Sequence, residues 1–352
     1  MKKALKIVLI ILLVLIGAVV IFLGWVTIRE YRPAVVEQLM LPAYDEDLGD
    51  LAAGGSLRIM SFNTGYAALS KTEDFFMDGG SKVMPDNAQL VDTNMEGIAQ
   101  IMAEADADLY FLQEVDTGSR RSYYFDQAAF YENELLMDGV YTYNYKADFV
   151  PYPIPPIGKV QSGLLTLTAY NFSEASRIAL PCPFSWPVRT VNLKRCILET
   201  RIPVAGTDKE LVLMNFHLEA YDSGEGKIAQ TKMLSSLMEE EYAKGNYVIA
   251  GGDFNQTFEG MDTYPILNKD DWVPGIISSE DLPEGFSFAV SDNVPTCRLL
   301  NGPYSGNYQD SQVYVIDGFI VSDNVAVDLV ENMDVGFEYT DHQPVVLDVT
   351  LK

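Results

Sequence analysis

The chain contains two histidines, His217 and His342, and both stand beside apolar runs where proton-transfer chemistry would need them. His217 ends the run that starts at Leu211, and His342 follows Asp341 just before the last apolar run of the chain. Histidine has the unperturbed proton affinity nearest to neutral pH, so it is the usual proton shuttle of enzymes. A histidine met alone is more often a satisfied core or surface residue. The companions of these two favour chemistry.

Polar residues also close or open several other apolar runs. Each of them alone is more often a turn former or a helix cap than a catalytic group. Several of them in order along one chain are hard to explain as turns, because active sites are assembled where buried strands end. The residues concerned are Asn63, Glu114, Asp253, Asn255, Asp317 and Asp341.

Two short motifs are the most specific of this set, Gly252-Asp253-Phe254-Asn255 and Asp341-His342-Gln343-Pro344. With Asn63, Gln113-Glu114 and Ile316-Asp317 in support, the chain resembles the endonuclease/exonuclease/phosphatase superfamily. That superfamily includes DNase I-like nucleases, neutral sphingomyelinases and inositol-polyphosphate phosphatases. The resemblance covers roughly Leu57 to Leu351.

The resemblance implies an α+β fold, a four-layer α/β sandwich of two packed, mainly antiparallel sheets flanked by helices. It also implies hydrolysis of a phosphoester by in-line attack of water, with Mg²⁺ bound. A carboxylate such as that of Glu114 is a hard oxygen ligand that suits Mg²⁺ or Mn²⁺. Asn63 would help to position the ion, and Asp341 would be a direct or indirect ligand.

The remaining polar residues are assigned catalytic roles on the same resemblance. His342 would be the general base for the attacking water, and Asp317 would hold its other ring nitrogen. Asp253 would orient the nucleophile. Asn255, two residues further and therefore on the same side of an extended segment, would donate to a phosphate oxygen. His217 would stabilise the transition state or protonate the leaving group.

Two arginines, Arg120 and Arg121, follow Glu114 closely in the sequence. Guanidinium groups can hold a phosphate through two parallel hydrogen bonds, so a phosphate clamp is one interpretation. A solvated start of a helix is the other, and the sequence favours neither.

The elements that must position these residues are short apolar strands separated by a few helices, a pattern typical of a layered α+β domain. Periodicity predicts helices at 89–105, with Asp86 or Asn87 as N-cap, at 122–136 and at 228–242. It predicts strands at 57–62, 109–112, around 164, 196–202, 211–216, 247–250, 314–321, 326–330 and 345–351.

The N-terminus carries an uncharged run, Ile7 to Ile28, which is long enough to span a bilayer. Lys2, Lys3 and Lys6 precede it, so the positive-inside rule places the first residues in the cytoplasm and the rest outside. A cleavable signal peptide is the alternative, but no clear cleavage site precedes Arg29. We therefore expect a cytoplasmic tail (1–6), a single-pass anchor in the cell membrane (7–28), a linker (29–55) that tethers the domain, and a catalytic domain (56–352).

The formal net charge of −26 over 352 residues argues against tight, sequence-independent binding of nucleic acid. It does not exclude a nuclease that acts through metal ions. Three cysteines are too few for a disulfide framework, although a Cys182–Cys196 bridge fits an oxidising compartment. Cysteine spacing typical of a structural zinc site is absent from the sequence.

The sequence thus predicts a membrane-anchored, Mg²⁺-dependent phosphoester hydrolase, most simply a phosphodiesterase. A phospholipid head group fits the anchor and two apolar, proline-rich loops, 149–157 and 183–187, which are otherwise long connections packed on the core. The alternatives are a DNase-like endonuclease, a phosphomonoesterase of the inositol-phosphate type and, from another class, a catalytically silent binding module. No protein partner is predicted.

Overall fold

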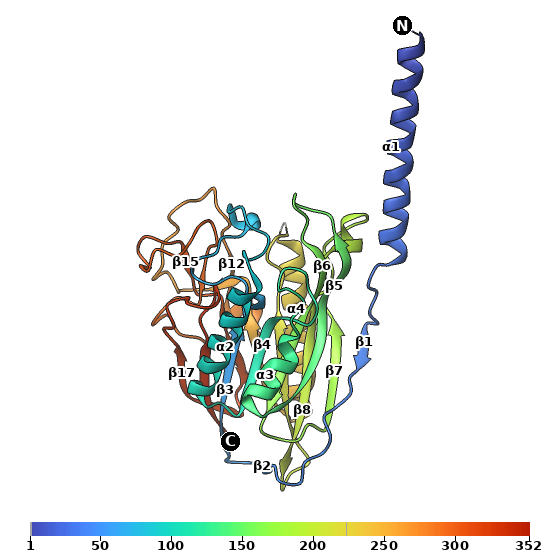
Figure 1. Cartoon of the computed structure of the whole chain (residues 1–352). Helices are drawn as coiled ribbons and strands as arrows, with labels where there is room; N and C mark the ends of the chain where they lie inside the picture. The colour runs from blue at the N-terminus through green and yellow to red at the C-terminus, as the bar shows by residue number, and fades with distance from the viewer. Residues whose placement is uncertain (1, 223) are drawn as a thin grey trace.

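The computed structural model describes residues 2–222 and 224–352. Two large sheets pack face to face, and helices cover the outer face of each (Figure 1). This is the predicted α+β sandwich. A long apolar helix, α1 (Lys2–Ile28), projects from the domain at the N-terminus.

The first sheet has eight strands in the order β1-β7-β8-β9-β10-β16-β13, with β2 added on β8. Its pairs are antiparallel except β9–β10 and β2–β8. The bounds are β1 (Val36–Gln38), β2 (Leu51–Ala52), β7 (Glu174–Ala179), β8 (Cys196–Ala205), β9 (Glu210–His217), β10 (Tyr247–Asp253), β13 (Phe286–Ala289) and β16 (Asp317–Ser322).

The second sheet has six strands in the order β17-β18-β3-β4-β6-β5, with β3 and β4 parallel. The bounds are β3 (Ser56–Asn63), β4 (Leu109–Asp116), β5 (Asp138–Val150), β6 (Gly158–Thr168), β17 (Val325–Asn332) and β18 (Val345–Leu351). Two small two-stranded sheets lie in the loops: β11 (Gln256–Phe258) with β12 (Gly275–Ile277), and β14 (Cys297–Arg298) with β15 (Val313–Tyr314).

Three helices cover the sheets: α2 (Ala88–Ala105), α3 (Gln127–Leu135) and α4 (Glu225–Ala243). Asn87 is the N-cap of α2, and its side chain accepts a hydrogen bond from the backbone of Leu90, as its position in the sequence predicts. The described residues also form four short 3₁₀ helices: η1 (Gly65–Ala67), η2 (Phe76–Asp78), η3 (Val188–Val191) and η4 (Ser279–Asp281).

The central strands are buried on both faces, because alternate residues enter different cores. In β9, Leu211 and Leu213 join the core between the two sheets, whereas Val212 and Met214 pack in the core under α4. The same alternation in β3 sends one set of side chains to the inter-sheet core and the other to the core that holds α2. These strands are therefore packed on both faces, and the candidate site lies where they end.

The segment between α1 and β3, which contains the expected linker, is paired with the domain. Its strand β1 pairs with β7, and β2 pairs with β8, so the segment runs along the domain. The side chain of Glu30 is only 2% exposed and contacts Arg189 at 2.9 Å. Backbone pairing and an ion pair of the buried Glu30 thus fix the start of the domain to the end of α1.

Two predicted elements differ from the structure. The predicted helix at 122–136 starts only at Gln127, because Tyr123 and Tyr124 have positive φ angles and Ser122 donates to the carboxylate of Asp116. The predicted strand at 314–321 is broken before Asp317, and its two parts belong to different sheets.

The three cysteines are free thiols, so the Cys182–Cys196 bridge does not form in this structure. Cys196 is buried in β8, whereas Cys182 is exposed in the loop that precedes η3.

Candidate active site

The candidate catalytic residues meet at one edge of the sandwich because of the strand directions. The carboxyl ends of β3, β9 and β10 bring Asn63, His217 and Asp253 to this edge. The antiparallel strand β16 starts there, so that Asp317 lies opposite Asp253 in the register. The turn before β18 adds His342 from the other sheet.

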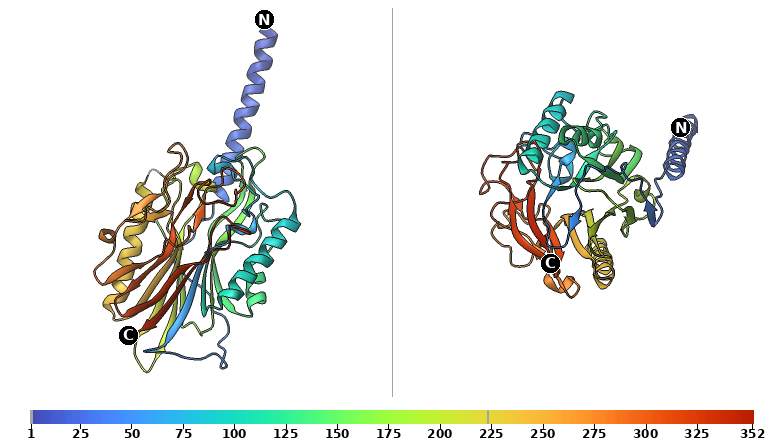
Figure 2. Two further views of the ribbon diagram at one scale, coloured as in Figure 1. Left: turned by 90° about the vertical axis from the view of Figure 1, so that its left-hand side faces the viewer. Right: turned by 90° about the horizontal axis from the view of Figure 1, so that it is seen from below.

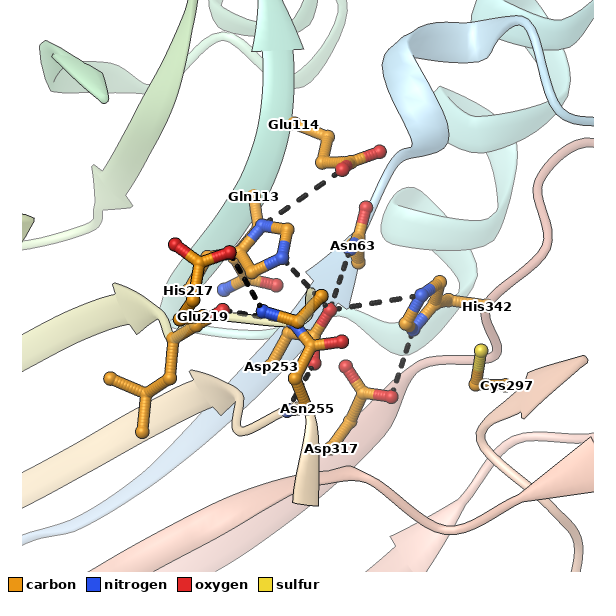
Figure 3. Close-up of polar contacts among 12 residues, drawn as sticks. Asn63, Gln113, Glu114, His217, Glu219, Asp253, Asn255, Cys297, Asp317 and His342 are labelled. Carbon is orange, nitrogen blue, oxygen red and sulfur yellow. Dashed lines mark hydrogen bonds and ion pairs between the residues drawn. The ribbon is translucent and has the colours of Figure 1, made fainter. Parts of the chain in front are cut away.

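The carboxylate of Asp253 is the centre of the site (Figure 3). Its Oδ2 accepts a hydrogen bond from Nδ2 of Asn63 at 3.0 Å. The same oxygen lies 3.3 Å from Nε2 of His217 and 3.8 Å from Nε2 of His342. Three side chains from three separate elements thus converge on one buried oxygen.

His342 is held from behind by Asp317. Its Nδ1 lies 2.9 Å from Oδ2 of Asp317, so its Nε2 faces Asp253. Burial alone would lower the pKa of His342, but the charges of Asp317 and Cys297 and their hydrogen bonds outweigh it and raise this pKa well above the usual value. Asp317 therefore both orients the ring and stabilises its protonated form.

His217 has the opposite electrostatic character. Burial, the nearby guanidinium of Arg195 and the charge of His342 lower the pKa of His217 well below its usual value. Its Nδ1 lies 4.0 Å from Oε1 of Glu114, and its Nε2 points to Asp253. The surroundings of His217 therefore favour the neutral imidazole, whereas those of His342 favour the imidazolium.

The carboxylates of the site repel one another. Burial and the charge of Asp341 raise the pKa of Glu114 to about 8. Burial and the charge of Asp317 raise the pKa of Asp253 to about 7. Burial also raises the pKa of Asp341. Such a cluster stabilises a bound cation, because a cation removes the repulsion.

Glu114 reaches the cluster through an irregularity of its strand. It has a φ of 56°, and the register of β4 against β6 shifts between Leu112 and Val115. In this left-handed conformation the side chain points in a different direction from the regular alternation of the strand, as at a β-bulge.

The donors present suit a divalent cation. Two groups of described residues could hold a metal ion, Asp253 with Asp317 and His342, and Cys297 with Asp341 and His342. Within the chain described here, Oδ1 of Asp317 is buried without a hydrogen-bond partner. Carboxylate and amide oxygens dominate the site, a set that hard cations such as Mg²⁺ and Mn²⁺ prefer.

Asp341 and His342 do not diverge as they would on an extended backbone. One ligand atom of each lies within 4.8 Å of the other and of Sγ of Cys297. Asp341 is buried and accepts a hydrogen bond from the side chain of Thr340 at 3.3 Å. It therefore belongs to the same cluster as the histidine.

Asn255 also departs from the expected geometry. It has a φ of 50°, and the strand ends at Asp253, so the two residues do not lie on one extended segment. Its backbone N–H donates to Oδ1 of Asp253 at 2.8 Å, and its side-chain Nδ2 donates to the carbonyl of Leu218 at 2.9 Å. In this structure Asn255 supports Asp253.

The two arginines considered as a phosphate clamp are engaged elsewhere. Arg121 binds both carboxylate oxygens of Asp116, at 3.0 and 3.1 Å, and its guanidinium stacks 3.4 Å from the ring centre of Tyr66. Arg120 donates to the carbonyl of Pro156 at 2.5 Å. Of the two, Arg121 lines the cavity of the site.

Some residues of the site were not identified from the sequence. Arg195 pairs with Glu219 at 3.3 Å beside His217, and both line the cavity. Glu219 stands two residues after His217, which is a signal that the sequence offered. Below the site, Gln113 donates to Asn215 at 2.9 Å and joins the two sheets. Buried polar links of this kind have no periodic signature.

The comparisons with known proteins concern the family and the fold of the chain. A sequence model of the "Endonuclease/Exonuclease/phosphatase family" matches residues 60–342. No match was found among curated protein sequences. An endonuclease/exonuclease/phosphatase structure from Beutenbergia cavernae shares 19% identity with a TM-score of 0.56, over 84% of this chain and 72% of that one.

A second such structure, from Bacteroides vulgatus, has 15% identity and a TM-score of 0.55, over 85% of this chain and 100% of that one. TDP2 of D. rerio, complexed with a single-strand DNA product, has 15% identity and a TM-score of 0.50, over 84% of this chain and 99% of that one. At these identities the neighbours establish the fold. Together with the match over most of the chain, they show that the protein belongs to the endonuclease/exonuclease/phosphatase family, whose enzymes act on phosphoester bonds and generally depend on a divalent metal.

Proposed function

We propose that this protein is a membrane-anchored, Mg²⁺- or Mn²⁺-dependent phosphodiesterase whose catalytic domain lies outside the cytoplasm. The observation that carries the proposal is the convergence of Asn63, His217 and His342 on the carboxylate of Asp253. Two imidazoles that face one buried carboxylate from separate elements are an arrangement suited to moving a proton on and off a reacting phosphoester.

In this proposal His342 removes the proton of the attacking water through its Nε2. Asp317 fixes the ring, because the bond at Nδ1 leaves Nε2 directed to the reacting side. Asp253 accepts a hydrogen bond from the same water and so orients its lone pair. His217, on the other side of Asp253, stabilises the charge on the phosphoryl oxygens or protonates the leaving oxygen.

Glu114, Asn63 and Asp341 are the proposed metal ligands, and Asn63 lies 3.0 Å from Asp253. A bound Mg²⁺ or Mn²⁺ would supply the positive charge that stabilises the phosphoryl group, and it would lower the pKa values of the surrounding carboxylates and of His342. The raised pKa values of Glu114 and Asp253 support this assignment, since they mark carboxylates that lack a compensating charge. Arg120 and Arg121 stay proposed phosphate contacts, provided that substrate releases them from their present partners.

The membrane part of the proposal depends on α1. The described residues contain one helix long and apolar enough to cross a membrane. At about 1.5 Å per residue, its 27 residues exceed the roughly 30 Å of a hydrocarbon core. The lysines that precede the apolar run favour a cytoplasmic N-terminus.

DNA hydrolysis is a second candidate, because the D. rerio neighbour is complexed with a single-strand DNA product. The net charge of −26 weakens it, since such a surface repels a polyanion at long range.

The test uses the full chain in detergent micelles with three water-soluble substrates: bis-p-nitrophenyl phosphate, p-nitrophenyl phosphate and single-stranded DNA. We expect hydrolysis of the diester with Mg²⁺ or Mn²⁺, its loss with EDTA, and at least a thousandfold lower kcat for His342→Ala. Binding of Mn²⁺ followed by electron paramagnetic resonance checks the metal site without activity. Faster hydrolysis of the monoester than of the diester would identify the enzyme as a phosphatase and not a phosphodiesterase. Full activity of folded His342→Ala, or metal binding without hydrolysis of any substrate, would refute the proposal.

A further inference from the structure

The cavity of the active site extends to the membrane helix. Its volume is about 810 Å³, within the range of small-molecule sites. Its lining includes Asp253 and His342, and it also includes Phe22, Leu23 and Val26 from the last turns of α1. A helix that only anchored the domain would not be expected to line a catalytic cavity.

The wall between the catalytic residues and α1 is largely apolar. It is formed by side chains from η2, from β5 and the turn that follows it, and from η3 and the segment that leads into it. These include Phe76, Tyr145, Tyr152, Phe184 and Val191. A purely polar substrate, such as a nucleotide chain or an inositol phosphate, would gain no hydrophobic contact from this apolar wall. A molecule with a phosphate at one end and an apolar body would use all of it.

Three contacts hold the end of α1 in this position. The rings of Phe22 and Phe149 meet edge to face at 6.5 Å. Nε1 of Trp186 donates to the hydroxyl of Thr27 at 3.1 Å. Together with the pair between the buried Glu30 and Arg189, they hold the end of α1 against the apolar part of the cavity.

The rim of the mouth exposes apolar side chains beside α1. Ile154 is 94% exposed, and Tyr152 is 68% exposed in the same turn. Trp186 and Val188 are 54% and 53% exposed in the segment around η3, which contacts α1. Figures 1 and 2 show that α1 leaves the domain on the side of the β5–β6 turn, away from the C-terminus. If α1 crosses a bilayer, these side chains lie at its surface, where aromatic and apolar groups are favoured.

The charged side chains near the mouth also fit a position at the bilayer surface. In a chain of 24 basic and 50 acidic residues, Arg29, Arg32 and Arg189 gather at this junction with side chains 59%, 61% and 44% exposed, against the two acids that pair with them, Asp148 and Glu30. Lipid phosphates lie at this depth. The acidity of the rest of the domain disfavours an anionic bilayer and points to a zwitterionic one.

We propose that the cavity binds a phospholipid taken from the bilayer that holds α1, with its phosphate at Asp253 and its acyl chains between the β5–β6 turn and α1. The inference rests on the proposed function and names its substrate class. In the reaction, a water oxygen bonds to phosphorus and one P–O ester bond breaks, giving a phosphomonoester and an alcohol. The proton of the water passes to His342, and the leaving oxygen takes up a proton.

The test compares two substrates with one preparation of the full chain in phosphatidylcholine vesicles. One substrate is the vesicle lipid, followed by the release of its head group, and the other is bis-p-nitrophenyl phosphate. The variant is Ile154→Glu, at a rim position that does not line the cavity. The control is Leu136→Glu, which is also exposed (90%) but lies before the start of β5, at the opposite end of that strand.

We expect the full chain to hydrolyse the lipid, and Ile154→Glu to lower the ratio of lipid to soluble-diester hydrolysis at least tenfold. Leu136→Glu should leave this ratio within twofold. Hydrolysis of bis-p-nitrophenyl phosphate without hydrolysis of lipid would overturn the inference and leave the proposed function in place. An unchanged ratio in Ile154→Glu would also overturn it. Failure on every substrate would refute the proposed function itself.

Discussion

Replacement of Asp317 by asparagine tests the proposed role of His342 most directly. The substitution keeps the shape of the side chain but removes the charge 2.9 Å from Nδ1 of His342. A buried hydrogen bond to a charged group contributes about 1.5–3 kcal/mol, and the orientation of the ring is lost in addition. A loss of about 3–4 kcal/mol in the transition state corresponds to a fall in kcat of roughly 10²- to 10³-fold.

The same substitution has a second, independent signature in the pH profile. Asp317 is the foremost cause that raises the pKa of His342, so the imidazole of Asp317→Asn loses its proton at a lower pH. A general base acts in its deprotonated form, and the acid limb of kcat should therefore move to lower pH. A residue that only supported the fold would not shift this limb.

The assay is the hydrolysis of bis-p-nitrophenyl phosphate between pH 5 and 9 at saturating Mg²⁺. Asp348→Asn is the matched control, since it also removes a paired aspartate but from the Arg58 pair on β3 and β18, far from the site. Circular dichroism checks that both variants are folded. A kcat of Asp317→Asn within threefold of the wild type, with an unmoved acid limb, would refute the assignment of His342 as the base.

Two further predictions follow from the pKa shifts. Because the pKa values of Glu114 and Asp253 are raised to about 8 and about 7, metal binding must displace protons from them. Calorimetry with Mg²⁺ at pH 7 in buffers of different ionisation enthalpy should show release of about one proton per ion, falling toward zero by pH 9. Equal heats in all buffers at pH 7 would contradict it. The second concerns Glu241, whose pKa is raised by burial but lowered more strongly, to about 2, by hydrogen bonds from Arg201, Lys244 and Asn246. A depressed carboxyl pKa stabilises the fold above the pKa of the unfolded state, and this contribution is lost as pH falls toward 2. Glu241→Gln should therefore lower the free energy of unfolding by about 2–3 kcal/mol at pH 7 and by less than half of that at pH 3. Urea denaturation in detergent measures both values, and an equal loss at both pH values would contradict the reasoning.

Much of the site could be predicted from the sequence because its residues stand at the ends of apolar runs. A buried strand ends where polar side chains and turn residues follow in the sequence, so the position of its end can be predicted. Asn63, His217 and Asp253 were located in this way, and their strands end where the pattern predicted within a few residues. Periodicity also located α2 and its cap, because both depend on neighbours within one turn.

The local backbone at the site was less predictable. Glu114 and Asn255 both adopt positive φ angles, which no sequence pattern of non-glycine residues indicates. For this reason the extended geometry assumed for Asn255 was wrong. The break before Asp317 was not predicted either. The apolar run is continuous in the sequence, and its pattern does not indicate that its two parts belong to different sheets.

The sequence by itself determined which residue types are available, the order of the strands that carry them and the apolar helix that precedes them. Only the tertiary structure decided that Asp253 is the meeting point of both histidines, that Arg121 is held by Asp116, and that the end of α1 lines the catalytic cavity. These contacts join residues separated by up to hundreds of positions. Their geometry depends on how two sheets and a helix pack together, and no local sequence pattern indicates this packing.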